Sequence, residues 1–317
     1  MKYLVTGGAG FIGSHFCEYV LNKYKNAQVV CYDKLTYAGS LSNLNNIIDN
    51  KNFIFIKGDI CDKKQVESVI TKHEITAIIN FAAESHVDRA IESSAEFLQT
   101  NYRGVSVLID LAVKYNLRFH QVSTDEVYGD LPIESNLKFT EESLLKPSSA
   151  YSASKAAADL LVLSYVRTFN LKATISRSTN NFGTNQHTEK FLPTIITKAV
   201  KNQQIPVYGN GENVRDWLFV GEHCRAIDLI VTKGKIGEIY NVGANYELSN
   251  ITLVKRVLSL LNKPESLINF VEDRKGHDKK YSLSLNKIKN ELGFIPQNNF
   301  DKNLIGTIEY YTKKVVI

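Results

Sequence analysis

The sequence predicts an α/β protein built on a doubly wound parallel sheet. In the first half of the chain, short runs rich in Val, Ile and Phe alternate with helical patterns, and a glycine-rich stretch directly follows the first run. Strands without strict apolar–polar alternation are buried on both faces, and helices between them indicate βαβ crossovers. Ligands of such sheets bind beyond the carboxyl ends of the strands, so polar residues at those ends are the first candidates for a site.

The expected elements follow one another in a regular order. Strands are expected at Lys2–Thr6, Gln28–Tyr32, Phe53–Lys57, Ala77–Phe81, Arg118–Ser123 and Lys172–Arg177. Helices are expected at Ile12–Lys23, Lys63–Lys72, Glu96–Tyr115 and Ala150–Phe169. Beyond residue 178 the pattern loosens, with helices expected near Glu189–Lys201, Glu222–Thr232 and Ile251–Leu261 and a strand near Pro206–Tyr208.

This change of pattern predicts a division of the chain. Residues 1–178 are expected to form a Rossmann domain, and residues 179–317 mainly a smaller C-terminal α/β domain that binds substrate. Some of the later elements are expected to return to the large sheet.

Composition and charge exclude several classes of protein. The chain has 317 residues, of which 44% are hydrophobic, and it shows no long apolar run, so a globular protein without a membrane helix is expected. The net charge is +5, but the Lys and Arg residues are scattered, which predicts no nucleic-acid partner. The four cysteines show no CxxC spacing, and no signal-peptide pattern occurs, so reduced thiols and a cytoplasmic location are expected.

The stretch TGGAGFIG, Thr6 to Gly13, predicts a dinucleotide site. Gly7, Gly10 and Gly13 follow an expected strand and open an expected helix. Glycines there allow a tight turn and a close backbone approach to a pyrophosphate, and the helix N-terminus offers free N–H groups. Asp33 follows the second strand, where a carboxylate bonds the ribose hydroxyls and repels a 2′-phosphate, so NAD is favoured over NADP. The alternative is a simple glycine turn with a capping Asp.

Two further strand ends agree with this site. Asp59 follows the strand Phe53–Lys57 and is suitably placed for the adenine. The segment Asn80–His86 ends the next strand in small residues, which lets the backbone approach the dinucleotide.

The stretch YSASK supplies a candidate reactive pair. Tyr151 and Lys155 lie four residues apart on one helix face, behind a plausible helix start at Pro147 and Ser148–Ser149. A neighbouring ammonium group and an oxidised nicotinamide would both favour the phenolate, so the pair could deprotonate an alcohol while NAD accepts a hydride. Thr124 is expected to hydrogen-bond the reacting oxygen. The alternative is a half-exposed helix face.

Adjacent carboxylates at Asp125 and Glu126 directly follow Thr124 at the end of an expected core strand. Burying two neighbouring charges is costly, and two close carboxylates cannot both ionise easily, so one tends to keep its proton. Neighbours in a regular strand point to opposite faces, so the backbone must turn here if both are to face one ligand. The alternative is a helix-capping Asp followed by a solvated Glu.

Together these motifs resemble the extended short-chain dehydrogenase/reductase superfamily and, within it, the dTDP-glucose 4,6-dehydratases. The resemblance covers nearly the whole chain, and it is carried by TGGAGFIGSH, YDKLTYAGSLSNL, FAAESHVDRAI, STDEVYGD, YSASKAAAD, the pair Asn180–Asn181, YGNGENVRDWL and DRKGHD. Members with plain epimerase or decarboxylase activity usually lack the Asp–Glu pair, which makes that pair the most specific feature.

The resemblance implies a three-step reaction that produces a 4-keto-6-deoxy sugar nucleotide for deoxysugar biosynthesis. Oxidation at C4 transfers a hydride to NAD, with Tyr151 as the base. Elimination of water follows, in which Glu126 removes the C5 proton and Asp125 protonates the departing C6 hydroxyl. The hydride then returns to C6.

The resemblance also implies the binding residues. The NAD contacts are expected at Gly7, Gly10, Phe11, Ile12, Gly13, Asp33, Lys34, Leu35, Thr36, Asp59, Ile60, Phe81, Ala82, Ala83, Ser85, Thr100, Tyr151, Lys155 and Asn181. The substrate contacts are expected at Ser85, Thr124, Asn180, Lys190, Phe191, Pro206, Val207, Tyr208, Arg215, Asn250, Asp273, Arg274 and His277. Arg215, Arg274 and Lys190 suit a diphosphate, although each could be a surface charge. Tyr208 could stack on a base or belong to the core.

Other predictions concern metals and partners. His86 and His277 come with no ligand cluster, so no metal is expected.

From the resemblance we expect a homodimer whose interface is a four-helix bundle of the helices Glu96–Tyr115 and Ala150–Phe169. The chain departs from the family pattern at Phe182, Thr184, His187, Thr188, Phe191 and Lys275, which flank the substrate and leave its sugar and base open.

Three alternatives remain at this point. The enzyme could act on another nucleotide sugar such as UDP-glucose, or it could be a sugar-nucleotide 4-epimerase or decarboxylase that shares the 4-keto step. A third class is a catalytically idle NAD-binding protein that senses redox state or binds a partner or RNA.

Overall fold

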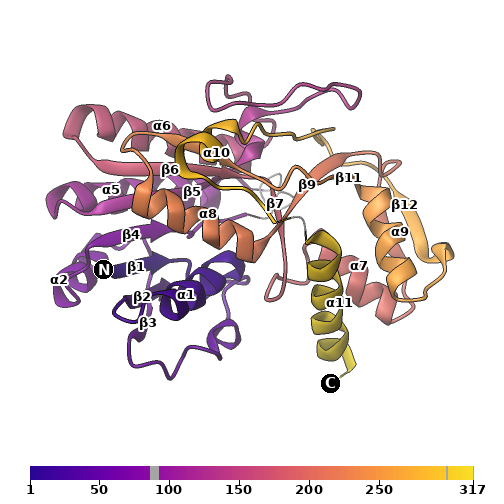
Figure 1. Ribbon diagram of the computed structural model, residues 1–317, viewed down its shortest axis with the longest axis horizontal. Helices are drawn as coiled ribbons and strands as arrows, with labels where there is room; N and C mark the ends of the chain where they lie inside the picture. Colours follow the sequence, from indigo (N-terminus) through magenta and orange to yellow (C-terminus); the bar gives the residue numbers. More distant parts are fainter. Residues whose placement is uncertain (86–92, 298, 317) are drawn as a thin grey trace.

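A seven-stranded parallel sheet forms the centre of the computed structural model, which describes residues 1–85, 93–297 and 299–316 (Figure 1). Its strand order is β10-β6-β5-β4-β1-β2-β3, and every neighbouring pair is parallel. The bounds are β1 Lys2–Thr6, β2 Gln28–Asp33, β3 Phe53–Lys57, β4 Ala77–Asn80, β5 Arg118–Thr124, β6 Lys172–Ser178 and β10 Ile239–Val242. The predicted doubly wound α/β fold is confirmed, because the chain builds outward from β1 in both directions.

Helices cover both faces of this sheet. One face carries α2 (Lys63–Lys72), α5 (Val105–Lys114) and α6 (Ala150–Phe169), and the other carries α1 (Phe11–Lys23) and α8 (Val220–Lys233). Each face has its own apolar core. Because both faces are covered, β1, β2 and β4 are almost wholly buried, and this is why they lack alternation in the sequence.

The predicted helix Glu96–Tyr115 is wrong in its first half. The structure has a short α4 (Ala95–Phe97) and then a π-helical segment, η2 (Leu98–Gly104), before α5 begins. The wider turn places the buried Asn101 side chain where it accepts from Glu84 N and donates to Glu84 O and Ser154 Oγ. Such π-bulges often occur at functional sites.

The smaller part of the molecule lies beyond the carboxyl ends of the large sheet (Figure 1). It contains a three-stranded sheet of β7 (Asn180–Phe182), β9 (Val214–Phe219) and β11 (Glu247–Ser249), and a two-stranded sheet of β8 (Ile205–Tyr208) and β12 (Ile268–Val271). The helices α7 (Phe191–Val200), α9 (Asn250–Leu260) and α11 (Phe300–Val316) share an apolar core with these strands, and α10 (Asn286–Leu292) packs near β10. Short helical turns occur at η1 (Leu41–Leu44), η3 (Asp125–Tyr128) and η4 (Glu265–Leu267).

One later strand, β10, pairs with β6 and so belongs to the large sheet. The division into domains at residue 178 stays a prediction.

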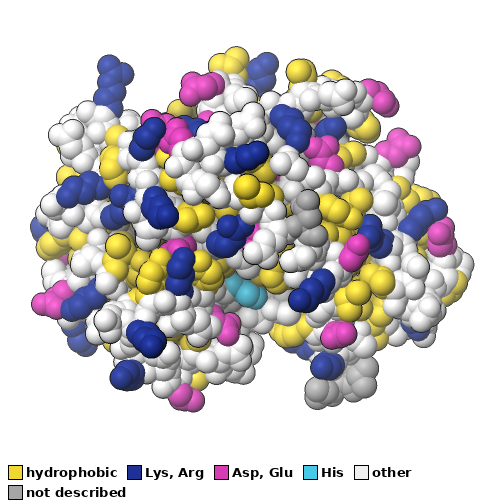
Figure 2. Space-filling view, in the orientation of Figure 1, with side chains coloured by type: hydrophobic (Ala, Val, Ile, Leu, Met, Phe, Trp, Pro, Cys, Tyr) yellow, Lys and Arg dark blue, Asp and Glu magenta, His cyan; other side chains and the backbone are white. Residues whose placement is uncertain are grey.

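Within the described parts of the chain, no helix is both long and apolar enough to span a bilayer. Lys and Arg side chains are dispersed over the face shown in Figure 2, without forming a single stripe.

The start of α6 is fixed by a reciprocal pair of hydrogen bonds, and this pair orients the helix that carries Tyr151. Ser149 Oγ accepts from Ser152 N and Ser152 Oγ accepts from Ser149 N, each over 3.1 Å.

Replacing Ser149 with Ala should lower the free energy of unfolding by about 1 kcal/mol, because a helix N–H loses its partner. Urea denaturation measures this. Ser164→Ala, at an exposed position of the same helix, is the matched control and should change stability much less. Equal losses in both variants would contradict the capping role.

Candidate active site

The glycine-rich turn between β1 and α1 leaves no room for side chains. Gly7 has φ +68°, and a Cβ on it would lie 2.5 Å from Ala82 N in the turn after β4. A Cβ on Gly13 would lie 2.3 Å from Gly7 O. No side chain caps α1 at Gly10, so the N–H groups of its first turn remain available to an anion.

Asp33 stands at the end of β2, beside this turn. Its Oδ2 accepts from Ala9 N over 3.0 Å and its Oδ1 from Leu35 N over 2.8 Å. Burial raises the pKa of the carboxyl group, and these two N–H groups oppose the rise. A carboxylate has further lone pairs, so Asp33 can still accept from ribose hydroxyls.

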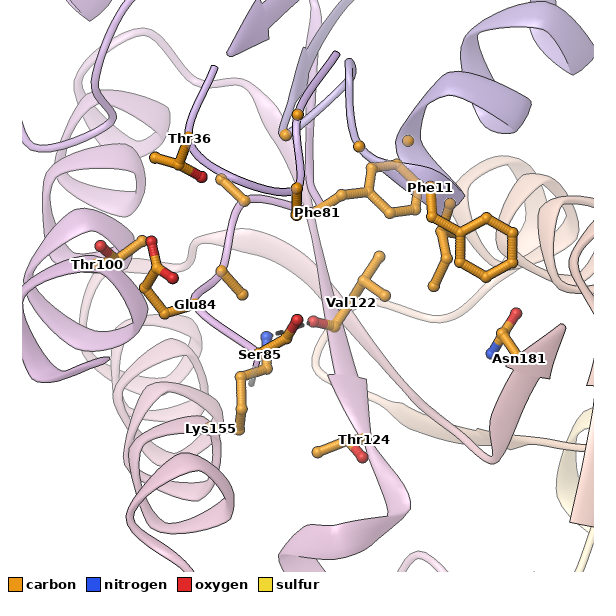
Figure 3. Close-up of a pocket in the computed structure, with 18 of the residues that line it drawn as sticks. Phe11, Thr36, Phe81, Glu84, Ser85, Thr100, Val122, Thr124, Lys155 and Asn181 are labelled. Atoms are coloured by element: carbon orange, nitrogen blue, oxygen red, sulfur yellow. Dashed lines mark hydrogen bonds between the residues drawn. The ribbon is translucent and has the colours of Figure 1, made fainter. Parts of the chain in front are cut away.

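A cavity of about 330 Å³ runs along the carboxyl ends of the strands from this turn to α6 (Figure 3). It is lined by every predicted NAD contact except Leu35, whose backbone instead holds Asp33. The narrow glycine turn, the uncapped helix start and the carboxylate at the end of β2 together fit a dinucleotide of the NAD type.

Asp125 and Glu126 lie on a turn directly after Thr124. The sequence predicted such a turn, because both side chains can face one cavity only if the backbone leaves the strand there. β5 ends at Thr124 and η3 begins at Asp125, so the backbone leaves the strand between them. Thr124 Oγ1 accepts from Glu126 N over 3.3 Å and donates to Asp125 Oδ1 over 3.2 Å. Thr124, Asp125 and Glu126 all line the cavity, and Asp125 Oδ2 is buried with no hydrogen-bond partner among the described residues.

Burial raises the pKa of both carboxyl groups, but to different extents. The pKa of Asp125 lies well above its usual range because of burial and the neighbouring Glu126. The pKa of Glu126 is also raised by burial, but the positive charges of Arg215 and Lys190 oppose the rise. Asp125 is therefore the group that more readily keeps its proton.

Tyr151 and Lys155 both reach the cavity from α6. Lys155 Nζ donates to Val122 O over 2.7 Å (Figure 3). Burial lowers the pKa of Lys155 to about 8, and the negative charge of Asp159 opposes this lowering. Burial raises the pKa of Tyr151, and the Glu126 and Asp125 carboxylates raise it further. In the protein alone, the tyrosine pKa therefore moves upward, opposite to the shift expected from the nearby ammonium group.

A second cavity of about 290 Å³ adjoins the first. The two share a wall formed by Ser85, Glu126, Asn180, Asn181, Gln186 and Lys190. The predicted substrate contacts Phe191, Pro206, Tyr208, Arg215, Asn250, Arg274 and His277 line the second cavity as well. Val207 packs into the core because neighbours in β8 face opposite sides, and Asp273 lines neither cavity but bonds His277 over 2.6 Å.

Positively charged side chains line the second cavity, among them Lys190, which is held by a hydrogen bond, and Arg215 and Arg274, which are held by packing on aromatic rings. Lys190 Nζ donates to Ser85 O over 2.8 Å. The guanidinium carbon of Arg215 lies 4.3 Å from the Tyr281 ring centre, and that of Arg274 lies 4.3 Å from the Tyr208 ring centre. Three cations beside one cavity suit a diphosphate.

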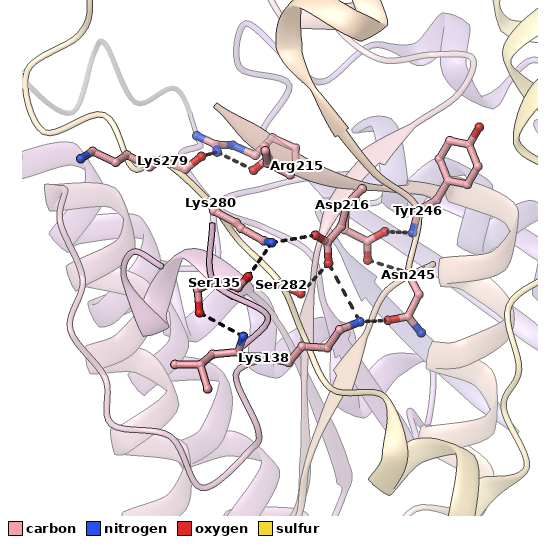
Figure 4. A network of polar contacts seen from close by, with 12 residues as sticks. Ser135, Lys138, Arg215, Asp216, Asn245, Tyr246, Lys279, Lys280 and Ser282 are labelled. Carbon is pink, nitrogen blue, oxygen red and sulfur yellow. Dashed lines mark hydrogen bonds and ion pairs between the residues drawn. The ribbon is translucent and has the colours of Figure 1, made fainter. Parts of the chain in front are cut away.

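The segment that carries Arg274 and His277 is tied to β9 (Figure 4). Arg215 donates to Lys279 O over 3.3 Å and to Asp278 O over 2.8 Å.

The Asp216 carboxylate accepts from the N–H groups of Ala244, Asn245 and Tyr246, which fixes the turn before β11.

Several lining residues were not predicted from the sequence. They include Glu84, Ser148, Thr179, Gln186, Trp217, Asp278 and Tyr281. Most of them adjoin a recognised motif, as Asp278 adjoins His277, so proximity to a motif was the only available signal.

The metal prediction concerns His86 and His277. No group of three metal-ligating side chains occurs among residues that the structure describes. His86 lies outside those residues.

The model of the GDP-mannose 4,6 dehydratase family matches residues 4–305. The chain belongs to this family. A dTDP-glucose 4,6-dehydratase of Haemophilus influenzae is 45% identical, with 98% of each chain covered. A dTDP-glucose 4,6-dehydratase of Streptomyces venezuelae, solved with NAD and TYD bound, is 42% identical, with a TM-score of 0.95 and coverage of 99% of this chain and 97% of that one. The resemblance to the dTDP-glucose 4,6-dehydratases is therefore confirmed.

The fold of the family extends to other chemistry. A UDP-glucose 4-epimerase of Thermotoga maritima, solved with UDP-glucose, is 27% identical, with a TM-score of 0.92 and coverage of 99% of this chain and 100% of that one. The fold alone does not decide between dehydration and epimerisation, so the side chains at the cavity must.

The buried Lys155 should give the protein a measurable pH dependence of stability. Its folded-state pKa of about 8 lies below the value of an unfolded lysine, so the unfolded chain binds more protons between these values and stability gains with rising pH. Relative to Lys155→Met, the wild type should gain about 2–3 kcal/mol in unfolding free energy between pH 7 and pH 10.

Urea denaturation of both proteins across this pH range measures the gain. Lys172→Met replaces an exposed lysine and is the matched control, for which no comparable change is expected. A constant difference between wild type and Lys155→Met at all pH values would show that Lys155 is not held at a lowered pKa.

Proposed function

We propose that this protein dehydrates dTDP-glucose to dTDP-4-keto-6-deoxyglucose, a step of deoxysugar biosynthesis, with NAD as cofactor. One observation carries the proposal: the Asp125–Glu126 pair lies on a turn at the junction of a dinucleotide cavity and a cation-lined cavity, next to Tyr151. The names of the curated relatives and of the solved structure with NAD and TYD support the choice of nucleotide and cofactor.

The residues of the glycine turn, Asp33 and the neighbouring strand ends would hold NAD along the first cavity. Bound NAD would accept a hydride from C4 of the sugar and return it to C6. Lys190, Arg215 and Arg274 would hold the diphosphate in the second cavity, with the sugar at the shared wall.

Tyr151 is the proposed base for the C4 hydroxyl, with Thr124 as a hydrogen-bond partner of the reacting oxygen. Burial and the neighbouring carboxyl groups raise the pKa of Tyr151 and so keep its phenol protonated in the protein alone. The positive charge of a bound oxidised nicotinamide would oppose this effect, so proton removal by Tyr151 would be confined to the complex.

Elimination requires a base and an acid together. The pKa of both carboxyl groups is raised, but that of Asp125 more than that of Glu126, and this difference divides the two roles. Arg215 opposes the pKa rise at both carboxyl groups, and Lys190 also opposes it at Glu126, which is therefore the proposed base for the C5 proton. Asp125 keeps its proton more readily and is the proposed acid for the departing C6 hydroxyl. An epimerase that only oxidises and reduces C4 has no use for this acid–base pair, and an idle binding protein has no use for Tyr151 either.

The first test is incubation of the purified protein with dTDP-glucose and, in parallel, UDP-glucose. Mass spectrometry should show loss of one water from the sugar nucleotide, faster for dTDP-glucose. Glu126→Gln and Asp125→Asn should each slow water loss about 100- to 10,000-fold, because elimination loses its base or its acid.

Both carboxylate variants should still oxidise C4, which absorbance of the reduced cofactor reports. Glu134→Gln, at a solvent-exposed carboxylate, is the matched control and should leave the rate unchanged. Isomerisation to a galactose nucleotide would support the epimerase instead. Faster loss of water from UDP-glucose would change the nucleotide but not the reaction.

We also propose that the protein is a cytoplasmic homodimer. All four cysteines are free thiols, which suits a reducing compartment.

Large apolar side chains are exposed near the predicted interface: Leu98, Tyr102, Leu160 and Phe169 are between 40% and 57% accessible. Apolar side chains gathered on adjoining helical segments are typical of an interface between copies.

Leu160→Arg should convert the dimer to a monomer, because a charge would be buried at the centre of the interface. Light scattering coupled to size-exclusion chromatography measures the mass. Leu144→Arg is the control, since Leu144 is 75% accessible but lies in the segment before α6, outside the predicted interface helices. A monomeric wild type, or a Leu160→Arg variant that remains dimeric, would contradict the proposed interface.

A further inference from the structure

A buried ion pair lies behind the proposed catalytic residues and lines neither cavity. Arg177 Nε, from β6, donates to Asp159 Oδ2, from α6, over 2.9 Å, and the two side chains are 2% and 0% accessible. Ser123 Oγ, from β5, donates to the same oxygen over 3.0 Å. Asp159 follows Lys155 by one helical turn, so the pair adjoins the helix face that carries the Tyr–Lys motif.

The guanidinium group of Arg177 also packs on an aromatic ring. Its central carbon lies 4.8 Å from the ring centre of Tyr128, the last residue of the η3 turn. Tyr128 Oη donates to Asn241 Oδ1 over 2.8 Å, and its ring stacks on Phe139. Arg177 therefore lies between α6 and the turn that presents Asp125 and Glu126.

The two units that Arg177 joins are held differently by the rest of the protein. α6 has independent anchors close to its reactive residues: the bond from Lys155 Nζ to Val122 O and the bond from Asn101 Nδ2 to Ser154 Oγ. The η3 turn has the local backbone bond from Gly129 N to Glu126 O, a backbone bond from outside, Lys146 N to Val127 O, and the side-chain anchor of Tyr128. Loss of Arg177 should therefore relax the turn more than the helix.

We propose that Arg177, held by Asp159, is a positioning residue that fixes the Asp125–Tyr128 turn against α6, so that it supports water elimination more than C4 oxidation. This inference rests on the proposed function. A buried ion pair often adds little stability compared with apolar residues of the same volume, so a positioning role gives a physical reason for placing one here.

The test uses two variants that break the link at different points. Arg177→Met removes the guanidinium group. Tyr128→Leu removes the ring on which it packs but leaves the ion pair with Asp159 intact. Tyr128→Phe keeps the ring but loses the hydroxyl bond to Asn241, so it separates the packing on Arg177 from that bond. Asp228→Asn is the control for loss of a buried carboxylate elsewhere. Asp228 is 2% accessible and pairs over 2.6 Å with Lys23, whose side chain is 42% accessible, between α8 and α1.

The first measurement separates the two chemical steps in a single turnover with dTDP-glucose. Absorbance of the reduced cofactor follows C4 oxidation, and mass spectrometry follows loss of water. Arg177→Met and Tyr128→Leu should slow water loss up to about 100-fold, as misplacement of reactive groups does, so that reduced cofactor accumulates. Oxidation should change far less. Asp228→Asn should keep the wild-type ratio of the two rates, and Tyr128→Phe, which retains the ring under Arg177, should slow water loss much less than Tyr128→Leu.

The second measurement is hydrogen–deuterium exchange of residues 124–130 in the protein without substrate. Exchange should become faster in Arg177→Met and Tyr128→Leu, much less so in Tyr128→Phe, and not in Asp228→Asn. If Arg177→Met does not fold, the comparison of Tyr128→Leu with Tyr128→Phe decides alone.

Equal slowing of both steps, or unchanged exchange over residues 124–130, would overturn the positioning role. If Asp228→Asn slowed water loss as much as Arg177→Met, the effect of Arg177 would be one of general stability, and the positioning role would be overturned. If the wild type removes no water from dTDP-glucose, the proposed function fails, while the exchange measurement still decides whether Arg177 fixes the turn.

Discussion

Burial of two adjacent carboxyl groups at the end of β5 is the constraint on which the site depends. Asp125 is almost inaccessible and Glu126 lies beside it, so their charges must be balanced by the surrounding structure. The protein meets this requirement with cations supplied by the smaller part of the chain, chiefly Arg215 and Lys190. The cations that suit the diphosphate therefore also set the ionisation of the acid–base pair.

The same constraint connects the large sheet with the smaller part of the molecule. Arg215 reaches the carboxylates from β9 and is fixed by the carbonyl oxygen of Asp278 and the ring of Tyr281. The segment around Asp278 is in turn bonded to Ser148, just before α6. One chain of contacts thus joins the substrate cavity to the start of the helix that bears Tyr151, so substrate binding and catalytic geometry depend on the same side chains.

Predictability from the sequence follows the range of the interactions involved. β1, β3, α2 and α6 match their predicted bounds because local apolar patterns, turns and caps specify them. The short strands β7, β11 and β12 were not predicted, since a strand of three or four residues carries too little pattern and forms only when a distant partner pairs with it. The π-helical segment at Leu98–Gly104 also escaped prediction, because Asn101 meets its partners Glu84 and Ser154 only in the folded chain.

The sequence by itself determined which reactive groups stand at the carboxyl ends of the strands, because strand ends and the spacing of Tyr151 and Lys155 are local features. It also determined the need for a turn after Thr124. Only the tertiary structure decided which positive charges face the carboxylates, that Val207 points into the core, and that the pKa of Tyr151 moves upward in the protein alone. The physical reason is that ionisation depends on burial and on charges distant in sequence, and both exist only once the chain has packed.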